Sequence, residues 1–390
     1  MSDEITSPAA AGAPAAVRPR LLASPAELSG ALGDLGTFLP HVLGVVTVVG
    51  MAPAGVLAGF GAFSIVTGLR YGIPIAVQPM KAASAAVLIE HLSPAEVAGA
   101  GLAIGLFFVA SGSSGLVDWL ARRIPAVLTA GVQLGLGLAL ALLGLDLARR
   151  EPLLGALVAL SMLATLRSRR LPAAVVGLAV GLAGESVLGA GIAWPEVSWG
   201  FHVPPVVWPG WADLLRGVEL AALPQIPLTL TNAVIVTSAL ARRLFPDEPR
   251  RATVRNLALS TGIANLLAAP LGGYPMCHGA GGLAAHYRFG SRSGTALVLI
   301  GLVFLVLGIG LGDGAVAVMR LVPESVVGAL LLFGGGELAR SARAERFRGA
   351  EAFVLALVAA LGLAVNAALA FAVGLALVTV WRRGRWTPGD

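Results

Sequence analysis

Long apolar stretches alternate with short polar segments along almost the whole chain, from residue 27 to residue 381. An α-helix needs about 20 predominantly apolar residues to cross the hydrocarbon core of a bilayer. The pattern therefore predicts an all-α polytopic membrane protein with about 14 spans; because several stretches are short or interrupted by Gly and Pro, about 12 spans also fit. The predicted spans are residues 27–50, 54–70, 73–90, 94–116, 124–145, 151–166, 171–191, 217–240, 253–270, 273–287, 294–312, 315–335, 350–364 and 366–381.

Composition excludes a soluble globular protein. Hydrophobic side chains make up 57% of the 390 residues and charged ones 12%, and the charged share is about half of that in soluble domains. A single soluble core stops growing at about 250–300 residues, so it could not bury this much apolar surface. The single cysteine, Cys277, excludes a disulfide framework and a multi-cysteine metal site. We therefore expect no cofactor and no redox chemistry.

The arginines predict how the chain is oriented. The net charge is +6, but the arginines form short groups between apolar stretches, so we expect no nucleic-acid partner. Cytoplasmic loops gather Lys and Arg, and with both termini cytoplasmic only Arg149 and Arg150 clearly fall on the outer side. The arginines predicted on the inner side are Arg122, Arg123, Arg167, Arg169, Arg170, Arg242, Arg243, Arg250, Arg251, Arg255, Arg288, Arg292, Arg340, Arg343, Arg346, Arg348, Arg382, Arg383 and Arg385.

Two segments fall outside the span pattern. Residues 1–26 begin with acidic residues and continue as an Ala/Pro mixture, which predicts a disordered cytoplasmic tail rather than a cleavable signal. Residues 192–216 contain four tryptophans among prolines, and indole rings favour the headgroup level of a membrane. The sequence thus predicts an outer interfacial loop with Trp194, Trp199, Trp208 and Trp211, in a protein integral to a bacterial-type inner membrane.

The two halves of the chain resemble each other weakly. Ala31–Thr37 resembles Ala222–Leu228 at an offset of 191 residues, and residues 78–83 resemble residues 274–279 at an offset of 196. Two matches at nearly one offset indicate an internal repeat. Residues 27–191 then form a first repeat of seven spans and residues 217–381 a second. Because seven is odd, the second repeat is inverted in the membrane, the arrangement of many secondary transporters.

A Pro-Met pair occurs at the matching place of each repeat, in spans 3 and 10. Proline favours the first turn of a helix and pushes the preceding residue to an extended conformation. Each segment is therefore predicted to be an extended chain that turns into a half-helix. Two half-helix N-termini that face each other would present free N–H groups and partial positive charge. Such a site, near the middle of the bilayer, suits an anion.

Lys81 is the only lysine beside 26 arginines, and it lies in the first of these segments. An amine in an apolar span is costly and is normally kept for a substrate, an ion or a partner; the alternative is an amine that snorkels to an interface. Asp34, in span 1, needs a partner, for which Lys81 and a coupling proton are the candidates; a structural ion pair or cap is the alternative. Thr37, nearby, could donate to an oxyanion or bond its own backbone.

Further polar residues lie in the second repeat. Span 8 holds Gln225, Thr229, Thr231 and Asn232 at the place equivalent to Asp34, and neutral donors suit an anion better than carboxylates do. Cys277, His278 and Gly279, with the small residues that follow, are predicted to open the second half-helix, where His278 could donate or titrate. No second ligand pair is spaced for a metal ion. Glu324 and Glu337 are interpreted as caps or gating contacts.

Several motifs resemble the molybdate transporter family, a relative of the sulfate permeases that lacks their cytoplasmic regulatory domain. The similarity covers residues 27–381, and the Pro-Met-Cys-His-Gly-Ala-Gly-Gly string is its most specific part. The motifs are residues 27–37, Gln78-Pro79-Met80-Lys81, residues 224–232, residues 275–283 and Tyr287-Arg288-Phe289-Gly290.

The resemblance implies a fold and a transport mechanism. It implies the seven-plus-seven inverted-repeat fold, in which a core domain (residues 27–116 and 217–312) carries the substrate between two half-helices. This domain slides, in an elevator-type alternating-access mechanism, against a gate domain (residues 124–191 and 315–381). The implied substrate is molybdate, a tetrahedral dianion carried as cargo. The predicted substrate-binding residues are Lys81, Gln78, Met80, Thr37, Gln225, Thr229, Cys277, His278 and Gly279, with Asp34 as coupling or charge partner.

Other functions compete with this interpretation. Sulfate or another oxyanion fits the same architecture, whereas nucleobase carriers of this fold tend to place carboxylates where this chain has Gln225 and His278. Gly310-Leu311-Gly312-Asp313 matches an intramembrane aspartyl protease pattern, but the Tyr-Asp span that such an enzyme needs is missing, so we expect no enzyme. An anion channel, coupling to protons or sodium, exchange, and a homodimer all stay open.

Overall fold

A computed structural model describes residues 21–22, 24–117, 119, 125–166, 168, 171–188, 199–246, 251–319 and 321–382. The α-helices of the first half are α1 (Pro25–Leu32), α2 (Leu35–Thr47), α3 (Pro53–Tyr71), α4 (Lys81–Ile89), α5 (Pro94–Ser114), α7 (Ala126–Ala148), α8 (Pro152–Thr165) and α9 (Ala173–Leu188). Those of the second half are α10 (Trp211–Gly217), α11 (Leu223–Leu228), α12 (Thr237–Leu244), α13 (Val254–Ala268), α14 (Ala280–Arg288), α15 (Thr295–Leu311), α16 (Asp313–Met319), α17 (Glu324–Ser341), α18 (Gly349–Ala364) and α19 (Ala367–Arg382). The π-helical segments Val218–Ala222 and Thr229–Val236 join α10, α11 and α12, and 3-10 turns follow at Ala269–Leu271 and Ala344–Arg346; the strands are β1 (Gln78–Pro79) and β2 (Met276–Cys277).

Every predicted span contains a described helix. Among the described residues, four helical segments are long and apolar enough to cross a bilayer, by length and composition alone: Pro53–Tyr71, Pro94–Ser114, Ala126–Ala148 and Trp211–Leu244. Exposed leucines such as Leu106, Leu153 and Leu160 lie on the outer surfaces of the helices, where a lipid solvent accepts them without cost. The all-α polytopic membrane architecture is confirmed, whereas the number of crossings stays a prediction.

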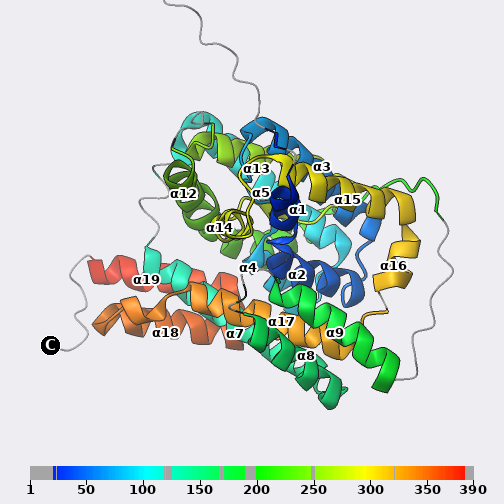
Figure 1. The fold of residues 1–390 in the computed structure, drawn as a ribbon. Helices are drawn as coiled ribbons and strands as arrows, with labels where there is room; N and C mark the ends of the chain where they lie inside the picture. The colour runs from blue at the N-terminus through cyan, green and yellow to red at the C-terminus, as the bar shows by residue number, and fades with distance from the viewer. Residues whose placement is uncertain are drawn as a thin grey trace, which may run out of the picture.

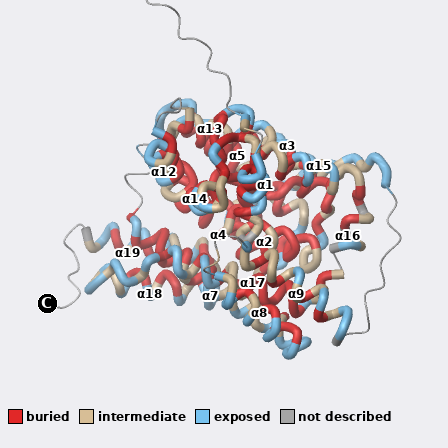
Figure 2. The backbone as a smooth tube through the Cα atoms, viewed as in Figure 1, coloured by how far each residue is buried: buried red, intermediate tan, exposed pale blue. Residues whose placement is uncertain are grey.

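The helices form two packed groups (Figure 1). In the first group, α3 packs on α15 and α5 packs on α13, with α1, α2, α4, α10–α12 and α14 around them. In the second group, α7 packs on α17 and α18, and α8 packs on α9. We call these the α3–α15 group and the α7–α17 group. Figure 2 shows buried positions inside both groups and exposed positions along their outer edges.

Glycines let α7 and α17 touch backbone to backbone. A Cβ added at Gly335 of α17 would lie 2.5 Å from the backbone nitrogen of Ala141, and one added at Gly137 would meet the backbone of Ala339. Such close approach lets two apolar helices associate by dispersion where water provides no hydrophobic drive. The close backbone contact therefore fixes α17 against α7, and with it the positions of the α17 side chains.

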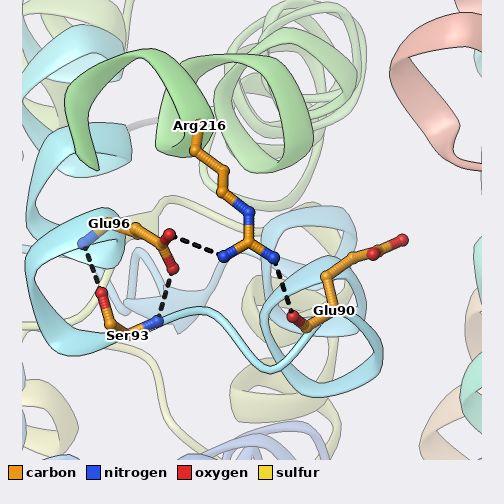
Figure 3. Close-up of polar contacts among 4 residues, drawn as sticks. All are labelled: Glu90, Ser93, Glu96 and Arg216. Atoms are coloured by element: carbon orange, nitrogen blue, oxygen red, sulfur yellow. Dashed lines mark hydrogen bonds and ion pairs between the residues drawn. The ribbon is translucent and has the colours of Figure 1, made fainter. Parts of the chain in front are cut away.

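An ion pair fastens the start of the second half to the first (Figure 3). Ser93 and Glu96 form a capping box at the start of α5, and the Glu96 carboxylate also accepts a hydrogen bond from Arg216 of α10 at 2.7 Å. Arg216 reaches the Glu90 carbonyl as well, at 3.5 Å. Because Glu90 caps the C-terminus of α4, this contact fixes that end of the helix.

Several sequence predictions need correction. Both Pro-Met segments begin their helices later than predicted, because Pro79 lies in β1 and Pro275 precedes β2, while α4 starts at Lys81 and α14 at Ala280. The prolines thus lie in the extended segments and not in a first helical turn. The predicted span 315–335 is split by Pro323 into α16 and α17, since the residue before a proline disfavours helix. Helix α1 starts at Pro25, inside the predicted tail.

Part of the orientation pattern falls outside the described residues: residues 1–20, Trp194, Arg122, Arg123, Arg167, Arg169, Arg170, Arg250, Arg383 and Arg385. Trp199, Trp208 and Trp211 are described and are 68–73% exposed. Arg150, an exception to the orientation rule, forms an ion pair with Glu324 at the start of α17. Because the orientation rule counts Lys and Arg and not net charge, this ion pair leaves Arg150 an exception to the rule.

Candidate functional site

The two Pro-Met segments meet, as predicted. Strands β1 and β2 pair antiparallel, with Gln78 opposite Cys277 and Pro79 opposite Met276. The Met80 N–H also donates to the Pro275 carbonyl at 3.0 Å. Extended segments inside a helical protein leave buried backbone groups without helical partners, and pairing with each other satisfies them. Since α4 follows β1 and α14 follows β2, the N-termini of both helices lie at the strand pair.

An asparagine of α13 clamps the second segment. The Asn265 side-chain oxygen accepts from the Met276 N–H at 3.0 Å, and its amide donates to the Met276 carbonyl at 2.7 Å. Asn265 is buried, so both bonds lie in a protected environment where they are strengthened. The sequence analysis missed Asn265, although a polar side chain within a predicted span was an available signal.

His278 links the two extended segments to each other. Its Nδ1 donates to the Ala76 carbonyl at 3.1 Å, and its Nε2 lies 2.7 Å from the Ser260 hydroxyl, which in turn lies 2.8 Å from the Tyr71 hydroxyl. The imidazole is fully buried beside Phe63. Both ring nitrogens are therefore occupied within the protein, and this geometry favours a positioning role for His278 over donation to a ligand.

Asp34 lies at the break between α1 and α2 and contacts the first segment. Its Oδ1 accepts from the Gln78 amide at 2.6 Å. A Cβ at Gly282 would lie 2.5 Å from Asp34 Oδ2 and 2.7 Å from the Gln78 amide nitrogen, and a Cβ at Gly279 would overlap the Gln78 side chain. Only glycine at these positions allows α14 to approach the Asp34–Gln78 pair so closely.

Lys81 is the first residue of α4, and its partner is not Asp34. Lys81 Nζ forms an ion pair with Glu337 Oε1 of α17 at 3.2 Å. The side chain of Lys81 is 19% exposed and that of Glu337 44%. Of the two candidate partners for Asp34, Lys81 thus forms its ion pair with Glu337, and the role of Asp34 as coupling or charge partner stays a prediction. His41 of α2 is buried within electrostatic range of both charges, and its Nδ1 has no hydrogen-bond partner among the described residues.

Gln225 caps α4. Its side-chain oxygen accepts from the Ala83 N–H at 3.0 Å, and its amide donates to the Thr229 hydroxyl at 2.8 Å. Ala83 is the third residue of α4, whose N–H has no partner inside the helix. Both side chains are buried. The two predicted substrate donors thus already have partners in the protein, and their role toward a substrate stays a prediction.

A cavity of about 940 Å³ opens between the two helix groups. Asp34 and Thr37 of the α3–α15 group and Glu337 of the α7–α17 group line it, together with Gly281 of α14. Lys81 reaches this wall through its ion pair with Glu337. Met80 and Cys277 are buried at the strand pair. Of the predicted site residues, Asp34 and Thr37 thus line the cavity, whereas the others lie outside its lining and His278 is turned toward α13.

The architecture defines a polytopic α-helical membrane protein with the fold of known anion transporters. The transmembrane domain of the cyanobacterial bicarbonate transporter BicA is similar with a TM-score of 0.69 at 17% identity, over 89% of this chain and 96% of that one. The structure of SLC26A9 is similar with a TM-score of 0.66 at 13% identity, over 92% of this chain and 65% of that one. Identities this low show the fold alone.

The sequence comparisons define the family. A family model described as "Molybdate transporter of MFS superfamily" matches residues 26–140 and 217–338. "Molybdate transporter 2" of Arabidopsis thaliana is 33% identical, over 86% of this chain and 82% of that protein. "Molybdate transporter 1" of the same plant is 31% identical, over 94% and 90%. The chain belongs to the molybdate transporter family.

Proposed function

We propose that this chain is a secondary active transporter that moves molybdate across the membrane by an elevator-type mechanism. The observation that carries the proposal is the β1–β2 pair, which brings the N-termini of α4 and α14 together beside the cavity. Molybdate enters as substrate, in line with the family to which the chain belongs.

The residues around the strand pair suit a tetrahedral dianion. The N-terminus of α14 has no side-chain cap, and its Gly281 faces the cavity with no atom near its missing Cβ. Free N–H groups there can donate to oxyanion oxygens, and the helix dipole favours negative charge. Lys81 supplies a full positive charge, and the Thr37 hydroxyl a further donor. Asp34 acts as the charge or coupling partner.

The proposed motion follows the two helix groups. The α3–α15 group corresponds largely to the predicted core domain (residues 27–116 and 217–312), and the α7–α17 group to the predicted gate domain (residues 124–191 and 315–381). The packing is also reciprocal between the halves, since α3 pairs with α15 and α13 with α5. This reciprocity supports an inverted repeat of seven plus seven spans, with α4 and α14 as half-helices. The arginine distribution is the ground for proposing that both termini are cytoplasmic.

The test is uptake of labelled molybdate into proteoliposomes that contain the purified protein, with sulfate, tungstate and uracil as competitors across a pH series. We expect uptake of labelled molybdate to be saturable. Unlabelled molybdate and tungstate should inhibit it, and uracil should not. Dependence on a proton or sodium gradient distinguishes secondary active transport from a channel. Strong inhibition by sulfate would favour sulfate as the substrate, and uptake that does not saturate would contradict a carrier.

A further inference from the structure

The Lys81–Glu337 ion pair links the two helix groups, which also pack on each other where α4 meets α7 and α2 meets α17. Lys81 starts α4 in the α3–α15 group, and Glu337 lies on α17 in the α7–α17 group. Glu337 does not cap a helix end: it lies inside α17, which continues to Ser341. Because α17 rests backbone to backbone on α7, a displacement between the groups would have to break this pair.

A second tie crosses the same boundary with different chemistry. Arg288 at the end of α14 donates to the Ser168 carbonyl at 2.9 Å. This acceptor is a neutral backbone group, whereas Glu337 offers a carboxylate to the amine. A carboxylate is an oxyanion, and it occupies a hydrogen-bonding place on Lys81 that an oxygen of a substrate anion would also use.

We propose that Glu337 is an internal competitor for the substrate: its carboxylate and the transported oxyanion bind Lys81 in alternation. The inference rests on the proposed function, because it assigns Lys81 to the anion site. While Glu337 holds the amine, the positive charge is offset and a dianion is repelled by the neighbouring carboxylate. When the substrate takes Lys81, the tie between the two helix groups is released.

The pair then couples occupancy to movement. A ligand shifts a conformational equilibrium only by its difference in affinity for the two states. The paired state has low affinity for the anion and restrains displacement of the groups, while the unpaired state has high affinity and lacks this restraint. The open cavity at Glu337 gives its side chain room to withdraw, and Gly336 beside it has no atom within 4 Å of a built Cβ.

The test is equilibrium binding of labelled molybdate to detergent-purified full-length protein. We expect Glu337→Gln to bind molybdate about 5- to 150-fold more tightly than the unmodified chain, the range of typical coupling between sites. Its maximal uptake rate falls, because an anion that is bound more tightly and meets no competing carboxylate leaves the site more slowly. Glu324→Gln is the matched control. Glu324 lies on the same helix and, like Glu337, pairs with a basic side chain, in this case Arg150. We expect this variant to leave the affinity for molybdate unchanged.

Two further variants make the outcome decisive. Glu337→Asp keeps the charge on a shorter side chain and should bind with intermediate affinity, which tests the inference even if Glu337→Gln fails to fold. In a Lys81→Ala background, Glu337→Gln should no longer tighten binding by the same factor. Unchanged or weaker binding by both Glu337 variants, with the unmodified chain binding normally, overturns the inference. If the unmodified chain does not bind molybdate, the proposed function itself fails.

Discussion

The N-termini of α4 and α14 meet at one strand pair but are built differently. Helix α4 begins with the charged Lys81, and the N–H of its third residue, Ala83, is capped by Gln225. Helix α14 begins with Ala280, Gly281 and Gly282, has no side-chain cap, and lines the cavity. The N-terminus of α4 supplies a charge on a flexible side chain, and the N-terminus of α14 supplies uncapped backbone N–H donors.

From this difference we infer that the two helix N-termini contribute differently to anion binding. A mobile amine can follow an anion and can change partners, because its three donors sit on a flexible stem. Backbone N–H groups cannot move without the helix, so they fix the orientation of a bound oxyanion. We expect changes at Lys81 to alter affinity and changes at Gly282 to alter geometry and stability, and the following predictions test this comparison in order of expected effect.

The largest effect is expected from Lys81→Ala. It should abolish saturable molybdate uptake and weaken molybdate binding by roughly 10- to 100-fold, because hydrogen bonds to a charged group contribute about 1.5–3 kcal/mol. The variant also leaves the Glu337 carboxylate unpaired at the cavity. Proteoliposome uptake and equilibrium binding measure both effects. Arg242→Ala, at an exposed position of α12, is the control, and undiminished uptake by Lys81→Ala would remove the amine from the site.

Asp34→Asn should follow in size. The asparagine oxygen can still accept from Gln78, so the pair at the strand is kept while the negative charge is lost. We expect transport to be uncoupled or slowed about tenfold or more, since a buried charge partner is worth one to a few kcal/mol. Uptake driven by an imposed proton gradient measures the coupling. A normal gradient-dependent rate would contradict a coupling role for this carboxylate.

Gly282→Ala tests the uncapped N-terminus of α14. Its methyl group would lie 2.5 Å from Asp34 Oδ2 and would meet the Ala76 side chain. Overpacking of this kind costs about 1–3 kcal/mol, so we expect a lower thermal unfolding temperature together with impaired uptake. For thermal stability, Gly281→Ala is the matched control, because a Cβ there has no described atom within 4 Å. Equal losses in the two variants would contradict close approach as the cause, since alanine has a higher helix propensity than glycine and Gly281→Ala should not lose stability.

The smallest effect is expected at the N-terminus of α4, which Gln225 caps. Gln225→Ala removes the cap of Ala83 and should lower the unfolding free energy by about 1 kcal/mol, with little change in molybdate affinity. Thr229→Val, which removes only the acceptor of the Gln225 amide, should cost less. Thermal unfolding and binding are measured on the same samples. A large loss of affinity in Gln225→Ala, without loss of stability, would instead place Gln225 among the substrate donors.

Local pattern predicted much of this arrangement. Every segment with apolar periodicity contains a helix, although α10 (Trp211–Gly217) forms in the predicted outer loop. The two Pro-Met pairs predicted that residues 79–81 and 275–279 lie together. The starts of α4 and α14 were predicted too early, because the preference of proline for a first helical turn gave way to strand pairing. That pairing depends on a segment almost 200 residues away, and a rule that considers only neighbouring residues cannot predict it.

Pairing between distant polar groups could not be predicted. Glu337 is 256 residues from Lys81, and nothing in the pattern around either residue distinguishes this partner from Asp34. Asn265 and Gln225 both proved to satisfy backbone groups of other elements, Met276 and Ala83. A polar residue within an apolar span signals that some partner exists, but only the packing of the helices decides which one.

The solitary lysine makes this transporter chemically addressable. Apart from the chain's own amino terminus, an acylating reagent that prefers amines has a single target in all 390 residues, and this target, Lys81, lies at the proposed anion site. Protection of one peptide from acylation, followed by mass spectrometry while the anion is titrated, would therefore report occupancy in the unmutated protein.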